Sequence, residues 1–140
     1  MIRKMATLVL MCGLSVTSGC FSFFEAATKA EPLVETRTVQ FDASKPAVVA
    51  AFRSAADSLH FSVDRFDGTQ GVIGGTTPAN SLTQGETFTI TVTATTPNTS
   101  SAQVQVDRGG ATNEYSEPLQ VIRHLVTRSQ ELLKDRKPTS

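Results

Sequence analysis

Alternation of residue types between positions 87 and 95 constrains the fold more than any other feature of this 140-residue chain. Apolar residues at every second position alternate with threonines, which are Thr87, Thr89, Thr91, Thr93 and Thr95. Because successive side chains of a β-strand point to opposite faces of its sheet, the segment predicts one buried face and one threonine-lined face in water. Such two-sided strands are typical of antiparallel sheets.

The segments on either side predict further strands. After the turn at Pro97-Asn98, residues 102–106 repeat the alternation, which predicts the second strand of an antiparallel hairpin. Residues 61–66 and 72–77 are rich in strand formers and are separated by Asp67-Gly68, a common hairpin turn. A short strand is also predicted at 36–41, where apolar and polar residues alternate.

Two segments have the spacing of amphipathic helices. Apolar residues recur at intervals of three and four from Val48 to Leu59 and again from Leu119 to Leu133. Pro46 and Pro118 suit the first turn of each helix, where a backbone N–H is not needed. Since a one-sided sheet and two one-sided helices can bury each other's apolar faces, we predict an α+β fold. It is a two-layer sandwich, an antiparallel sheet with two helices on one face, in the order β-α-β-β-β-β-α.

The first twenty residues have the composition of an export signal. Arg3 and Lys4 precede a short apolar run, and small residues follow it. The sequence Thr17-Ser18-Gly19-Cys20 resembles the lipobox of bacterial lipoprotein precursors. The resemblance implies cleavage before Cys20 and attachment of acyl chains, palmitate among them, which anchor a protein by about 0.8 kcal/mol per buried CH₂. The alternatives are an ordinary secreted protein cut nearby and an uncleaved membrane anchor.

Cysteine and charge counts are compatible with a mature chain that begins at Cys20. Cys12 is preceded by Met11 and cannot take the same role, so one cysteine remains and no intramolecular disulfide can form. Loss of Arg3 and Lys4 leaves 11 basic against 13 acidic side chains, a formal charge of −2. This balance argues against nucleic acid as a partner.

The same resemblance implies a location, and together with the strand and helix patterns it divides the chain into parts. Lipoproteins retained in the inner membrane commonly carry Asp directly after the cysteine, whereas this chain has Phe21. We therefore expect a lipid anchor in the outer membrane, on its periplasmic face, if the organism is Gram-negative. The expected parts are a signal peptide (1–19), a lipidated N-terminus and tether (20–35), a single α+β domain (36–135) and a flexible tail (136–140).

A second resemblance concerns the expected domain. The runs Val49-Ala50-Ala51-Phe52, Leu59-His60-Phe61 and Gly71-Val72-Ile73-Gly74 resemble small bacterial lipoproteins of uncharacterised function. The likeness covers residues 36–133, although His60 stands where those proteins usually have glycine. It implies a helix-grip-like fold, similar to component C of the outer-membrane β-barrel assembly machinery. It transfers no catalytic residue.

We find no catalytic, cofactor-binding or metal-binding motif. The G-x-S-x-G elbow of many serine hydrolases is absent. His60 lies near Asp57, Asp64 and Asp67 in the sequence, but these residues are expected on a helix end, a strand and a turn, so they are unlike convergent zinc ligands. The glycines of segment 68–75 separate two strands, which favours turn and bulge roles over phosphate binding.

These observations predict a non-enzymatic, membrane-anchored periplasmic lipoprotein that needs no cofactor and serves as an envelope accessory or interaction module. The alternative is a small-ligand-binding protein or a hydrolase with an unfamiliar site. Thr87, Thr89, Thr91, Thr93 and Thr95, or a free sheet edge beside them, form the expected interaction face for an envelope protein partner. A plain water-facing sheet would explain the same threonines by their strand propensity.

Overall fold

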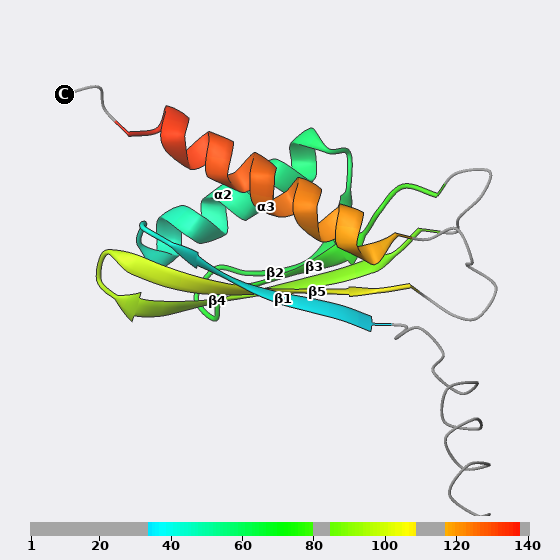
Figure 1. Ribbon diagram of the computed structural model, residues 1–140, viewed down its shortest axis with the longest axis horizontal. Coiled ribbons are helices and arrows are strands. Elements are labelled where there is room, and N and C mark those ends of the chain that lie inside the picture. Colours follow the sequence, from blue (N-terminus) through cyan, green and yellow to red (C-terminus); the bar gives the residue numbers. More distant parts are fainter. Residues whose placement is uncertain (1–33, 80–84, 109–116, 138–140) are drawn as a thin grey trace, which may run out of the picture. The chain divides into compact units, whose positions relative to one another are not determined.

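The computed structural model describes residues 34–79, 85–108 and 117–137, all of which belong to one compact unit, Leu33–Ser140. The predicted cleavage and lipidation site at Cys20 lies outside the described residues. The strands are β1 (Val34–Phe41), β2 (Ser62–Asp67), β3 (Val72–Thr76), β4 (Thr87–Thr96) and β5 (Thr99–Asp107). The helices are α2 (Lys45–Ser58) and α3 (Pro118–Asp135), so the predicted α+β fold and element order are confirmed (Figure 1).

The five strands form one sheet in the order β1-β5-β4-β3-β2, and every neighbouring pair is antiparallel. After β1 the chain crosses one face of the sheet as α2 and reaches the far edge at β2. Three successive hairpins then bring it back, so β5 lies beside β1. β1 begins two residues before its predicted start, because Val34 and Glu35 extend the ladder with β5.

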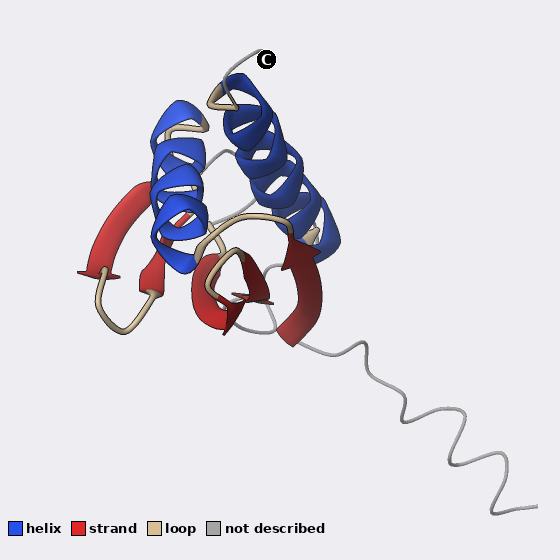
Figure 2. Cartoon of the chain, turned by 90° about the vertical axis from the view of Figure 1, so that its left-hand side faces the viewer, coloured by secondary structure: helices blue, strands red, loops and turns tan. Residues whose placement is uncertain are grey.

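Both helices lie on the same face of the sheet (Figure 2). Between the layers, Phe52 of α2 meets Phe41 of β1 edge-on, with ring centroids 5.5 Å apart. Phe88 of β4 meets Phe61 at 5.7 Å. Side chains from every strand except β2 and from both helices complete the buried core, among them Val48, Ile73, Ile90, Val104, Val106 and Leu125.

The alternation predicted for residues 87–95 holds over most of β4. Phe88, Ile90 and Val92 are buried, while the threonines between them are exposed or half-buried. Ala94, expected on the buried face, is exposed. The ladder with β5 shifts register between Ala94 and Thr96, and residues 93–98 around the turn are all exposed, so the buried face ends at Val92.

Helix α2 ends in a left-handed turn at His60. The amide of Phe61 donates to the Ala56 carbonyl (2.9 Å), and that of His60 donates to the Asp57 carbonyl (3.1 Å). This pair of bonds is the Schellman motif, which requires a positive φ at the residue after the C-cap. His60 has a φ of 60°, a conformation that a β-carbon disfavours by roughly 1–2 kcal/mol.

We expect His60→Gly to raise the free energy of unfolding by about 0.5–1 kcal/mol. Glycine adopts a positive φ without the steric strain of a β-carbon, and this gain exceeds the conformational entropy that glycine loses on folding. Urea denaturation measures the change. His124→Gly is the control, since His124 is exposed within α3. That variant is expected to lose roughly 0.3 kcal/mol of stability. Changes of the same sign in both variants would contradict the strain at His60.

Candidate functional site

One face of the sheet is turned away from the helices (Figure 2). Strand register and the alternation of burial place polar side chains of three adjacent strands on this face. The registers of β1 with β5 and of β5 with β4 align these side chains in three rows across the sheet. Each member is exposed or half-buried. We call this set the neutral grid; its rows are Thr36–Gln105–Thr89, Thr38–Gln103–Thr91 and Gln40–Ser101–Thr93.

All members of the neutral grid carry a hydroxyl or an amide, and none carries a charge. Such groups can both donate and accept hydrogen bonds. Within the grid, the Gln40 amide nitrogen donates to the Ser101 hydroxyl at 3.3 Å. Neighbouring strands lie about 4.8 Å apart, and side chains on one face repeat about every 6.8 Å along a strand. The face therefore offers a regular array of groups to a flat ligand.

The predicted interaction face overlaps the neutral grid without matching it. Thr89, Thr91 and Thr93 are members, and Thr87 lies one row beyond them, opposite Asp107. Thr95 lies where the ladder shifts register and has no opposite residue in β5. The contribution of β1 was not predicted, because the alternation does not reveal which strands are neighbours. The predicted role of the threonines in binding remains a prediction.

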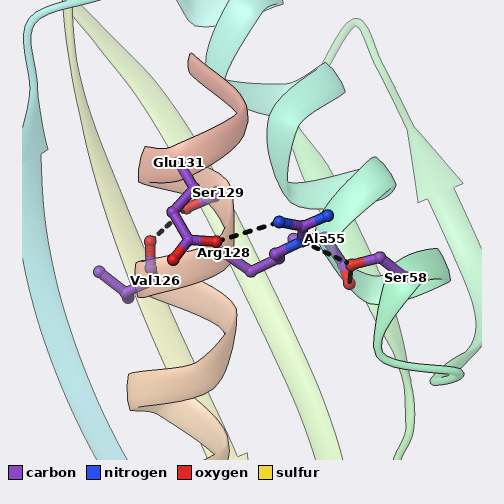
Figure 3. A network of polar contacts seen from close by, with 6 residues as sticks. All are labelled: Ala55, Ser58, Val126, Arg128, Ser129 and Glu131. Atoms are coloured by element: carbon purple, nitrogen blue, oxygen red, sulfur yellow. Dashed lines mark hydrogen bonds and ion pairs between the residues drawn. The ribbon is translucent and has the colours of Figure 1, made fainter. Parts of the chain in front are cut away.

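A polar network joins the two helices (Figure 3). Arg128 of α3 donates from Nε to the Ser58 hydroxyl (3.1 Å) and from Nη1 to the Glu131 carboxylate (3.0 Å). Ser58 in turn donates to the Ala55 carbonyl (2.9 Å), and Ser129 donates to the Val126 carbonyl (2.8 Å). Each hydroxyl proton is held by a backbone acceptor, so this network positions the helices and offers no nucleophile.

A second polar cluster lies at the ends of β3 and β4. Thr77 and Glu86 are 8% and 7% exposed. The Glu86 amide donates to the Thr77 hydroxyl oxygen (2.8 Å), the Thr77 amide donates to the Glu86 carbonyl (2.9 Å), and the Thr77 hydroxyl donates to the Glu86 carboxylate. No sequence pattern predicts this cluster, because Thr77 and Glu86 meet only when β3 pairs with β4. These reciprocal bonds hold the residue that follows β3 beside the residue that precedes β4.

Two acidic sequence neighbours of His60, Asp57 and Asp67, contact other groups. Asp57 contacts Arg53 at 3.4 Å, and the Asp67 carboxylate accepts hydrogen bonds from the amides of Thr69 (3.0 Å) and Gln70 (2.9 Å) in the β2–β3 turn. Within residues 34–79, 85–108 and 117–137, no group of three His, Cys, Asp or Glu side chains could hold a metal ion.

The predicted turn and bulge roles of the glycines agree with the structure. Gly71 has a φ of 74° at the end of the β2–β3 turn, and its carbonyl accepts the Val92 amide at 2.8 Å. Gly75 lies opposite Val63, next to a register shift in β2.

Among the helices of the described part of the chain, none is long and apolar enough to cross a membrane.

No protein-family model and no curated protein sequence match the chain. Solved structures do resemble it in fold. A START superfamily protein from Mycobacterium smegmatis is 10% identical, with a TM-score of 0.53, and the match covers 73% of this chain and 97% of that one. Norcoclaurine synthase from Thalictrum flavum, in complex with dopamine and hydroxybenzaldehyde, is 10% identical, with a TM-score of 0.50 and coverage of 76% and 88%. At this identity the likeness shows the fold alone.

Proposed function

We propose that the protein is a lipid-anchored bacterial lipoprotein whose folded domain serves as a non-enzymatic accessory or interaction module of the envelope. The observation that carries the proposal is the lipobox-like sequence Thr17-Ser18-Gly19-Cys20 behind a basic and then apolar N-terminus. Phe21 after the cysteine, in place of Asp, favours the outer membrane on its periplasmic side.

The position of the fold along the chain suits such an anchor. β1 begins at Val34, which leaves residues 21–33 between the acylated cysteine and the first strand. A fully extended chain of this length reaches at most about 45 Å. The domain would therefore stay close to the lipid surface while its sheet face remained free to meet other components of the envelope.

Three serines of the described residues are hydrogen-bonded in a way that does not suit a hydrolase nucleophile. A serine nucleophile must be hydrogen-bonded to a base that removes its proton. The hydroxyls of Ser58, Ser100 and Ser129 donate instead to backbone carbonyls, at 2.9, 2.7 and 2.8 Å. These serines are therefore used to hold the helices and the sheet in place.

The anchor is tested by replacing either cysteine of the full chain, expressed in a Gram-negative bacterium. Cys20→Ala is expected to abolish labelling with an alkyne analogue of palmitate, since it removes the acylated thiol. The matched control, Cys12→Ala, is expected to label like the wild type, because Cys12 belongs to the signal peptide. Mass spectrometry of the mature wild-type N-terminus then identifies the acyl groups.

An unmodified Cys20 in the wild-type protein would contradict the proposed anchor, as would label that survives in Cys20→Ala. Sedimentation of membranes in a density gradient tests the location separately. The acylated wild type is expected with the outer-membrane fraction. Recovery of the acylated protein with the inner membrane would overturn the sorting proposal and leave the anchor intact.

Binding of a small ligand is the second candidate function. It is favoured by the likeness in fold to norcoclaurine synthase, which was solved with two small aromatic molecules. A ligand entering between the helices and the sheet of this chain would have to displace the buried rings of Phe41, Phe52 or Phe88. The test is the melting temperature of the protein with and without such a molecule. A rise that is lost after substitution of a core residue between the helices and the sheet would favour ligand binding over the role of an interaction module.

A further inference from the structure

The neutral grid differs from an ordinary protein surface in its lack of charge. Charged residues make up 19% of this chain, so about two would be expected among the members of the grid. Charged residues lie outside it. Asp107 occupies the row beyond Thr36. Arg65 and Asp67 lie on β2, separated from the grid by Gly74 and Val72 of β3.

The size of the grid restricts what could bind there. Three strands and three rows, with their side chains, cover about 15 by 20 Å, or roughly 300 Å². A stable protein–protein interface buries about 800 Å² on each partner, so the grid is too small to hold a folded protein by itself. An extended peptide binds at a sheet edge, where main-chain groups are free, rather than on a sheet face.

The chemistry of the grid restricts the occupant further. Nucleic acid requires cationic side chains, and a lipid or an aromatic ligand requires an apolar surface. The grid offers hydroxyls and amides, which both donate and accept hydrogen bonds. A polymer that is itself uncharged and rich in hydroxyl groups matches this array.

We propose that the neutral grid binds a neutral glycan strand laid flat across β1, β5 and β4. This inference goes beyond the proposed function and does not depend on the lipid anchor. Sugar hydroxyls would exchange hydrogen bonds with Gln103 at the centre of the grid and with the threonines on either side of it, Thr38 and Thr91. Since these bonds compete with water, we expect a dissociation constant of about 1 mM for one short oligosaccharide, with stronger retention on a polymer that offers many overlapping sites.

Native affinity electrophoresis of the full chain, purified as the cell produces it, tests the proposal. The gel contains hydroxyethylcellulose, a neutral glucan, and a detergent without sugar groups keeps the protein soluble. The wild type is expected to migrate more slowly than in a gel without glucan. The double variant Thr91→Ala with Gln103→Ala is expected to bind about tenfold more weakly, because it removes the centre of the grid.

The matched control carries the same two substitutions on the opposite side of the molecule, Gln120→Ala with Thr127→Ala. Both residues are exposed on α3, so this variant is expected to be retarded like the wild type. Unfolding midpoints in urea establish that all three proteins are folded. Lack of retardation of the wild type would overturn the proposal, as would equal retardation of both double variants. A crosslink from position 91 to an envelope protein, without glucan binding, would also overturn it and assign this face to a protein partner.

Discussion

Replacing Phe52 by alanine is expected to lower the free energy of unfolding by about 3–5 kcal/mol, because it leaves a cavity where both layers meet. Phe52 is 0% exposed on α2 and packs edge-on against Phe41 of β1. The loss combines the transfer free energy of the ring with the contacts that its neighbours no longer make. Urea titration of the purified wild type and variant measures the difference.

The control removes the same side chain at the edge of the sheet. Phe66 of β2 is 50% exposed, and the Arg53 guanidinium lies 5.4 Å from its ring centroid. Phe66→Ala is expected to cost about 1 kcal/mol or less, since much of the ring already contacts water. If the two variants lost the same stability, Phe52 could not occupy the buried position between the layers.

Side-chain periodicity made the element types and their order predictable. In β4 the apolar positions Phe88, Ile90 and Val92 face the helices and the intervening threonines face water, because the strand repeat is two residues. The apolar spacing in α2 likewise predicted that Val48 and Phe52 face the core. A single sequence records such patterns directly, since each depends on residues that are close along the chain.

The candidate site was only partly predictable, because it depends on which strands are neighbours. Thr38 of β1 and Thr91 of β4 flank Gln103 of β5, although Thr38 and Thr91 are far apart in the chain. Alternation shows which side of a strand is buried, but it does not show which strand lies beside it. The grid therefore could not be predicted without the pairing of β1 with β5.

The burial of Glu86 was the other feature that sequence patterns did not reveal. A glutamate side chain is expected in water, yet Glu86 is only 7% exposed. Its carboxylate accepts a hydrogen bond from the Thr77 hydroxyl. Burial of a carboxylate requires partners that replace water. Those partners become apparent only when the ends of β3 and β4 are brought together.

Gly75→Ala is expected to lower the free energy of unfolding by about 3 kcal/mol, because an added β-carbon would overlap the main chain of the neighbouring strand. A β-carbon at Gly75 would lie 1.9 Å from the Ser62 carbonyl oxygen and 3.0 Å from Phe88 Cζ. The register shift in β2 between Val63 and Arg65 adjoins this close approach. The overlap with the Ser62 carbonyl oxygen can be removed only by movement of the backbone, because no side-chain rotation displaces that atom.

Gly74→Ala provides the matched control for this clash. The nearest atom to a β-carbon at Gly74 is Arg65 Cβ at 3.4 Å, an ordinary contact. The two positions are adjacent in β3, so the entropy that alanine removes from the unfolded chain is nearly the same and cancels in the comparison. Gly74→Ala is expected to stay within about 1 kcal/mol of the wild type. If urea titration gave equal stabilities for both variants, β2 would be free to move away from β3. Faster amide exchange of Ser62 and Val63 in Gly75→Ala alone would locate the expected strain at the bulge.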